Sequence, residues 1–299
     1  MHKSHRTWLT LLNMAMCGFH SAFAGVVLSM ANMKLSVPGY NTRLEFSAAT
    51  PTEAMRLTPV YDEQGGLRVS VLAVAFFACS AVAHLGNAVL WRTSYLYWLS
   101  RGKCPSRWAE YVVSALVMML AIAYTSGIRC YAQLVQIVAL TATTMLFGSL
   151  NEAINRPSWT GDDRWEHPLL TRAQAHVFGY LPQIAAWYCI LYAFLGAAER
   201  GGACRPPDFV YFIVLGEAAV FFSFGAPQLF QVLAPPSRYV WGEYAYQVLS
   251  LLAKGMLGAT LLINVLIYDS FDEAVAGGEA GSGSEFASGR DAATSGCGA

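Results

Sequence analysis

The chain has 299 residues, of which 55% are hydrophobic and only 13% are charged, and its formal net charge at pH 7 is zero. Soluble domains average about 25% charged residues, and the mean hydropathy here is +0.40. The composition therefore excludes a soluble globular protein. We expect an integral membrane protein whose partner is lipid and not nucleic acid.

Seven apolar stretches are long enough to cross about 30 Å of hydrocarbon as helices. They are Thr7–Met33, Val69–Trp91, Tyr111–Ile128, Cys130–Leu150, Ala173–Ala198, Phe209–Leu233 and Tyr244–Tyr268. They predict an all-α membrane protein, a seven-transmembrane helix bundle over residues 1–270. The first stretch is too long for the core of a signal peptide and has no small-residue cleavage site, so we expect it to remain in the mature protein. Little more than Arg129 separates the third and fourth stretches, which predicts a tight helical hairpin.

Residues 34–66 form the only long connection between the predicted helices. The alternation of residue types over Thr42–Phe46 and the run Met55–Tyr61 fit two short strands of a β-ribbon. Pro38-Gly39 and Gly65-Gly66 are typical turn and breaker dipeptides that bound these strands. An irregular loop is the alternative.

Basic residues in the loops predict the orientation in the membrane. The amino terminus and the loops on its side carry about ten basic residues and the other side about eight. Four of the ten lie within residues 92–107 with no acid between them. We therefore expect the amino terminus in the cytoplasm, and the carboxyl terminus and the β-ribbon outside.

Residues 271–299 consist mainly of Gly, Ser, Ala and acidic residues, which predicts a disordered tail. Within it, Gly281–Phe286 resembles a cloning linker and carries no functional argument. The seven cysteines follow no paired spacing. We expect neither a disulfide framework nor a metal site.

Lys254 lies near the middle of the last apolar stretch and is its only charge. An intramembrane charge costs roughly 2.5–3.5 kcal/mol or more, and at this depth the ammonium group does not easily reach the headgroups. An unprotonated lysine amine forms imines with aldehydes, so Lys254 is a candidate covalent anchor for a cofactor. A lysine that snorkels, or pairs with a carboxylate for structure only, is the alternative.

The third and seventh helices carry polar residues suited to such an anchor. Ser250 precedes Lys254 by one helical turn, so its hydroxyl can bond the lysine nitrogen, or else its own backbone. Arg107, Glu110 and Ser114 fall on one stripe of the third helix, and Glu110 is a candidate counterion or one half of an interfacial pair with Arg107. Counted from the predicted helix starts, Glu110 lies too near the surface to reach Lys254, so the two starts must be offset if these residues pair.

Two histidines lie in the predicted cytoplasmic half. His84 shares a helix face with Ser80 and Asn87, and His20 lies deeper on the first helix. Together with Glu110 and with Glu152 at the end of the fourth helix, they predict a water-filled polar cavity. Separate structural histidines are the alternative.

Aromatic and methionine side chains near the depth of Lys254 are candidates for the wall of a ligand slot, or else ordinary packing. They are Met118, Met119, Trp187, Tyr188, Phe221, Phe222 and Phe224. Pro182 and Pro227 are expected to break the backbone of their helices near that level and leave room.

The segments Arg107–Tyr111 and Ser250–Gly255, with the histidines, Glu152, the long external loop and the cytoplasmic amino terminus, resemble the heliorhodopsin family over about residues 5–270. Other microbial rhodopsins have the opposite orientation and a different motif on the third helix.

The resemblance implies all-trans retinal on Lys254 as a protonated Schiff base, with Glu110 as counterion and Ser250 bonded to it. It also implies a network of His20 and His84 and a homodimer supported by the ribbon. Retinal contacts are expected from Tyr111, Ser114, Met118, Trp187, Phe221 and Phe222. A proton network is expected to include Asn87, Arg107 and Glu152.

Glu217, in the outer half of the sixth helix, departs from the family pattern. It is either a neutral structural glutamic acid or a proton relay toward the outside. Two functions compete accordingly: a photosensory protein, which we favour, and a light-gated proton channel or transporter that uses Glu110, Glu217, His20 and His84. An enzyme is not expected, because no nucleophile–base pair, metal site or phosphate loop occurs. The sequence names no signalling partner.

Overall fold

The computed structural model describes residues 3–47, 56–160, 162–199 and 205–268. The predicted tail at residues 271–299 lies outside the described residues. Within them, seven helical segments are long and apolar enough to span a membrane. The chain is thus an integral, multi-pass membrane protein built as a seven-helix bundle, as predicted.

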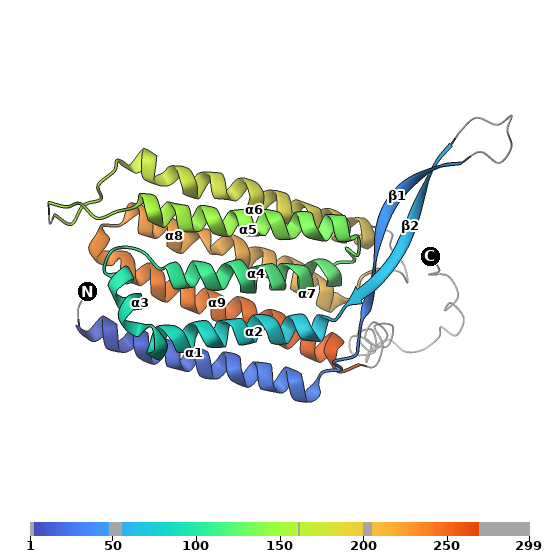
Figure 1. The fold of residues 1–299 in the computed structure, drawn as a ribbon, viewed down its shortest axis with the longest axis horizontal. Coiled ribbons are helices and arrows are strands. Elements are labelled where there is room, and N and C mark those ends of the chain that lie inside the picture. The colour runs from blue at the N-terminus through green and yellow to red at the C-terminus, as the bar shows by residue number, and fades with distance from the viewer. Residues whose placement is uncertain (1–2, 48–55, 161, 200–204, 269–299) are drawn as a thin grey trace, which may run out of the picture.

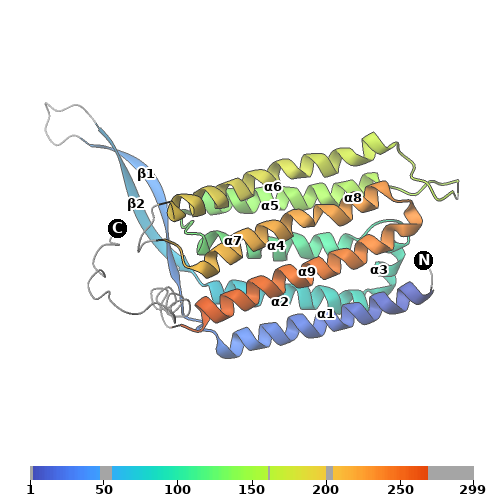
Figure 2. The ribbon, with the colours of Figure 1, turned by 180° about the vertical axis from the view of Figure 1, so that it is seen from behind.

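The spans lie side by side along the long axis of the molecule, with α1 at one edge of the bundle and α6 at the opposite edge (Figures 1 and 2). They are formed by α1 (Lys3–Met30), α2 (Val69–Leu85) with η1 (Gly86–Leu90), α4 (Pro105–Thr125), α5 (Tyr131–Ile154), α6 (Leu169–Ala198), α7 (Asp208–Ser223) with α8 (Gly225–Leu233), and η3 (Pro236–Arg238) with α9 (Tyr239–Leu261) and η4 (Leu262–Leu266). The end with the amino terminus is called the amino end, and the other is the ribbon end.

The connection between α2 and α4 contains a helix that the sequence analysis took for a loop. Helix α3 (Arg92–Leu99) runs across the amino end of the bundle in Figure 1. Its Tyr95 and Leu99 are buried in a small core with Leu9 and Tyr239. An eight-residue segment of mixed polarity shows little helical periodicity, because its packing against α1 and α9 comes from tertiary contacts.

Helix α3 also accounts for the depth of α4. After the turn at Gly102, where φ is +70°, Cys104 packs against Tyr95 and Leu99 of α3, and Arg107 in the first turn of α4 is only 5% exposed. Glu110 is thus deep in the bundle although it lies five residues from the helix start at Pro105. The offset between helix starts that pairing with Lys254 requires is therefore present.

The connection at the ribbon end is an antiparallel β-ribbon of β1 (Val37–Ser47) and β2 (Arg56–Leu67). The β-ribbon is confirmed and the irregular loop is wrong, although the strands are longer than predicted. Pro38-Gly39 and Gly65-Gly66 lie inside the strands, beside a bulge between Pro38 and Gly39. A Cβ on Gly39 would lie 2.8 Å from the hydroxyl of Tyr124, so this glycine lets the ribbon approach the bundle closely.

Two prolines behave differently in the structure. Helix α6 continues through Pro182, so the break predicted there is wrong. The sixth span does break at Phe224, between α7 and α8, shortly before Pro227. Pro227 has no backbone N–H to bond the carbonyl of Ser223 one turn earlier, which explains this interruption. The tight hairpin between α4 and α5 is confirmed, and it turns at Gly127 with φ +90°.

Candidate functional site

The amine of Lys254 lies inside the bundle. Lys254 is 3% exposed, and its Nζ lies 2.9 Å from Oε1 of Glu110 and donates to Oγ of Ser250 at 2.7 Å. The bond to Ser250 has the i, i+4 geometry that the sequence predicts. Lys254 therefore does not snorkel to a surface.

Glu110 receives a second donor from another helix. It is 7% exposed, and its Oε1 accepts a hydrogen bond of 2.6 Å from Oγ of Ser80 on α2. The predicted alternative of an Arg107–Glu110 pair is wrong: Arg107 bonds Glu152 and Glu243 instead. Helical side chains tilt toward the N-terminus of their helix, so Arg107 reaches toward the amino end while Glu110 stays one turn deeper.

A largely apolar cavity extends from Lys254 between α4, α5, α6, the α7–α8 break and α9. Its lining includes Trp108, Tyr111, Ser114, Met118, Met145, Gln183, Phe221, Phe222, Phe224, Ser250 and Lys254.

Not every predicted wall residue lines this cavity. Trp187 lies behind the wall, with its ring 5.6 Å from that of Phe221 in an edge-to-face arrangement. Met119 is buried in the main core. The expectation for Tyr188 is wrong, because its side chain is 64% exposed and faces away from the bundle. Periodicity predicts the depth of such residues in the membrane but does not determine which face of the helix they occupy.

The structure brings the two predicted histidines together. Their rings stack with centroids 5.4 Å apart, and Nδ1 of His84 lies 2.8 Å from Oδ1 of Asn13. Both ring nitrogens of the buried His20 lack a hydrogen-bond partner among the described residues. Asn87 shares a helix face with His84 but accepts its hydrogen bond from the indole of Trp91.

A second, smaller cavity lies beside the ion pair of Lys254 and Glu110. Its volume is about 20 Å³, and a cavity of about 10–15 Å³ on this measure admits one water molecule. Its polar lining consists of His84, Asn87, Ser106, Arg107, Glu110, Tyr111, Glu243, Gln247 and Ser250. It therefore connects the surroundings of Lys254 with Arg107 and Glu243 nearer the amino end.

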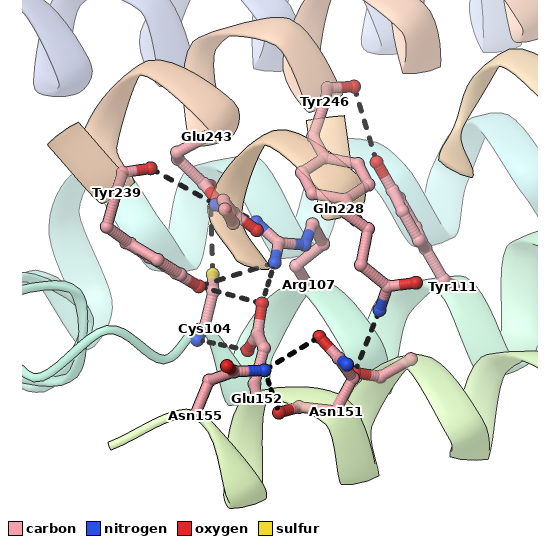
Figure 3. A network of polar contacts seen from close by, with 12 residues as sticks. Cys104, Arg107, Tyr111, Asn151, Glu152, Asn155, Gln228, Tyr239, Glu243 and Tyr246 are labelled. Carbon is pink, nitrogen blue, oxygen red and sulfur yellow. Dashed lines mark hydrogen bonds and ion pairs between the residues drawn. The ribbon is translucent and has the colours of Figure 1, made fainter. Parts of the chain in front are cut away.

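The guanidinium of Arg107 lies between two carboxylates at the amino end (Figure 3). One amino group bonds Glu152 of α5 and the other bonds Glu243 of α9. Glu152 also accepts hydrogen bonds of 2.7 Å from the backbone N–H of Cys104 and from the hydroxyl of Tyr239. We call Arg107, Glu152 and Glu243 the charge cluster.

Glu243 was not predicted as a site residue, because the predicted seventh span starts one residue later. The spacing of polar residues on this helix nevertheless indicates it. Glu243, Gln247, Ser250 and Lys254 follow one another at spacings of four, three and four residues, which places them on one helix face. All four are buried in the structure.

Two groups near the cluster lie outside the spans and act as donors. Burial, followed by the charge of Glu243, holds the pKa of the Cys104 thiol well above its usual range. The same causes, in the same order, raise the pKa of the Tyr95 hydroxyl, which donates to Oε1 of Glu243 at 3.0 Å. Both groups therefore keep their protons near neutral pH.

Glu217 lies apart from both cavities. It is on α7, in the part of the sixth span nearer the ribbon end, and it is 0% exposed. Its carboxyl oxygens have no partner side chain among the described residues.

Solved structures with the same fold are microbial rhodopsins. Cyanorhodopsin from Tolypothrix sp. NIES-4075 is 12% identical, with a TM-score of 0.57 over 93% of this chain and 99% of that chain. The light-driven proton pump of Coccomyxa subellipsoidea is 14% identical, with a TM-score of 0.59 over 85% and 96%. Xanthorhodopsin, a light-driven ion pump with a dual chromophore, is 11% identical, with a TM-score of 0.60 over 94% and 98%. At these identities the likeness shows the fold alone.

The fold and the buried lysine–carboxylate pair define a rhodopsin-type seven-helix membrane protein. The Heliorhodopsin family model matches residues 9–266, and the chain belongs to this family. No curated protein sequence is significantly similar to it. Family membership implies a retinal chromophore, and the residues fit one: a buried amine, a carboxylate partner and a largely apolar cavity beside them.

Proposed function

We propose that the chain is a photosensory protein that carries all-trans retinal as a protonated Schiff base on Lys254. The observation that supports this most directly is the distance of 2.9 Å between Lys254 Nζ and Glu110 Oε1 beside the aromatic-lined cavity. Burying an ion pair gives little net stability, so a pair at this depth is better explained by a function. When bound, retinal supplies absorption of visible light and isomerisation.

The protein's own groups hold the positive charge and its proton in place. Glu110 is the counterion, and Ser80 fixes its carboxylate from α2. Ser250 accepts the hydrogen bond from Lys254 Nζ and orients that nitrogen. Tyr111, Ser114 and Met118 of α4 would hold the polyene from one side, and Phe221 and Phe222 from the other. Trp187 would support this wall through its contact with Phe221.

The proposed sensor keeps the displaced proton inside the protein. The small cavity places His84, Asn87, Arg107 and Glu110 around space for about one water molecule. Through its contact with His84, His20 belongs to the same network. These groups can accept or position a proton without opening a path to the surface.

We further propose a homodimer, with the amino terminus in the cytoplasm and the ribbon outside. The ribbon supports this, because Leu44, Phe46 and Leu57 are exposed on it. An exposed apolar surface outside a membrane favours contact with a partner.

A light-gated proton channel or transporter is the second candidate. It is favoured by Glu217, because an ionised carboxylate without a partner is costly in a membrane, whereas a neutral one can exchange a proton when water reaches it. Glu110 and His84 lie toward the amino end of Lys254 and Glu217 toward the ribbon end. Together they would form a discontinuous path.

Two measurements test the proposal. The purified protein should gain a visible absorption band when all-trans retinal is added, and its absence would refute retinal binding. Patch-clamp recording of illuminated cells then separates the two functions. A sensor gives no photocurrent at any voltage or pH gradient, whereas a channel or transporter gives a proton current.

A further inference from the structure

The small cavity lies between the ion pair of Lys254 and Glu110 and the charge cluster. Glu110 and Ser250 lie at its inner end, beside Lys254, and Arg107 and Glu243 lie nearer the amino end. Glu110 and Ser250 both contact Lys254 Nζ, so the cavity, with space for about one water molecule, extends from the partners of this nitrogen to the carboxylate of Glu243. A proton that leaves Nζ thus has a short route to the charge cluster.

The charge cluster is one proton short of neutrality. One guanidinium faces two carboxylates, and all three side chains are more than nine-tenths buried. A buried charge without a full counter-charge is costly, and protonation of one carboxylate removes it. The pair is therefore suited to take up one proton, while the other carboxylate keeps Arg107 neutralised.

The remaining polar groups around the pair are donors. Tyr95 donates to Glu243 at 3.0 Å and Tyr239 donates to Glu152 at 2.7 Å. The thiol of Cys104 lies 3.7 Å from Oε1 of Glu243. Because burial keeps Tyr95 and Cys104 protonated, they do not compete for the arriving proton.

We propose that the Glu243–Glu152 pair is the acceptor of the proton displaced from Lys254 Nζ by light. This rests on the proposed retinal function. The N–H bond at Nζ breaks and its electron pair stays on the nitrogen. Ser250 Oγ, which accepts the hydrogen bond from Nζ, takes this proton and releases its own to a water molecule in the small cavity, and the water passes one of its protons to a carboxylate oxygen of Glu243. The cluster becomes neutral, Nζ loses its positive charge, and Glu110 remains ionised.

This displacement also defines how the signal reaches the amino end. An ionised Glu110 beside a neutral amine is unfavourable in a buried site, so it holds part of the light energy and drives the proton back. A protonated Glu243 no longer attracts Arg107 or accepts from Tyr95 as strongly. Tyr95 is on α3, so the protonation state of the Glu243–Glu152 pair acts on this helix at the amino end.

Light-minus-dark infrared spectroscopy of the protein loaded with all-trans retinal tests the assignment. A carboxylic-acid C=O band should appear as the visible band is lost, and it should be absent or displaced in Glu243→Gln and in Glu152→Gln. Glu166→Gln, an exposed glutamate near the same end, is the matched control and should keep the band. A band that persists unchanged in both cluster variants, or that vanishes in Glu217→Gln, would overturn the proposal.

A second readout follows the thiol of Cys104 and is made first in the otherwise unchanged chain, where every residue of the charge cluster is present. Its S–H stretch, identified by its loss in Cys104→Ala, should shift together with the new C=O band. The retinal-free protein should show the same S–H shift in the dark when acid protonates the pair, and Glu243→Gln should not. An S–H band that is unchanged in both settings refutes the acceptor even where pigment forms, whereas failure to form pigment refutes the proposed function itself.

Discussion

Nζ of Lys254 and Oε1 of Glu110 lie 2.9 Å apart between α9 and α4, and both side chains are more than nine-tenths buried. Replacement of a buried ion pair by apolar residues is often neutral or stabilising, so stability alone gives little reason to keep one. The pair is explained by what the amine does when retinal is bound to it.

Lys254→Ala should give a folded protein with no visible band after addition of retinal. The substitution removes the only amine in the described lining of the cavity, and alanine forms no imine. Absorption spectra before and after illumination with hydroxylamine measure this, with Lys34→Ala at an exposed position as the control. A coloured Lys254→Ala protein that still reacts with hydroxylamine would disprove the assignment.

Glu110→Gln should alter both the colour and the alkaline stability of the pigment. Removal of an opposite charge within about 4–6 Å shifts a protonation equilibrium by roughly 1–3 pH units. The visible band should therefore be lost at a correspondingly lower pH, and its maximum should move to the red where the nitrogen stays protonated. A pH titration of the band measures this. An unchanged maximum and midpoint would place the counterion elsewhere.

Arg107→Gln should destabilise the protein, because it leaves Glu152 and Glu243 without their cation in a buried site. Breaking a buried pair in this way costs about 3–5 kcal/mol. Thermal unfolding in detergent measures the change, and Arg101→Gln, at an exposed position in the turn before α4, provides the comparison. Equal unfolding temperatures for the two variants would contradict the role of the charge cluster.

Cys104 should make the folded protein sensitive to alkali. Burial raises the pKa of its thiol in the folded state, so the folded protein keeps this proton where the unfolded chain, with an ordinary pKa of about 8.5, loses it. The contribution to stability is complete below that pH and declines above it. Cys104→Ala should flatten the decline in unfolding free energy above about pH 8.5. Cys17→Ala, at a half-buried position, should not.

Glu217→Gln decides between the two proposed functions. If light opens a proton path, the wild type gives a photocurrent that reverses with the proton gradient, and this variant loses the current while it keeps the visible band. If the protein is a sensor, neither chain gives a current. The variant then differs from the wild type only in stability, because glutamine keeps the size of the side chain but lacks the carboxyl proton.

Much of the fold follows from local sequence patterns. Long apolar runs predict the seven spans, because each helix must satisfy its own backbone hydrogen bonds within the lipid. The alternation of residue types around Arg43 predicts the β-ribbon. Helix α3 was missed because its eight residues are too few to show a period, and the break near Pro182 was wrong because α6 accommodates that proline.

The sequence by itself determined the position of the buried amine and its hydrogen-bond partner on the same helix. Lys254 stands alone in an apolar run, and Ser250 lies one turn away on the same helix, so their contact depends only on helical geometry. The partners that come from other helices were decided by the tertiary structure. Arg107 bonds Glu152 and Glu243, and not Glu110, because α5 and α9 pack beside the start of α4 and present these carboxylates to it. The relative depth of helices and the faces that they share are set by packing, and no single segment encodes them.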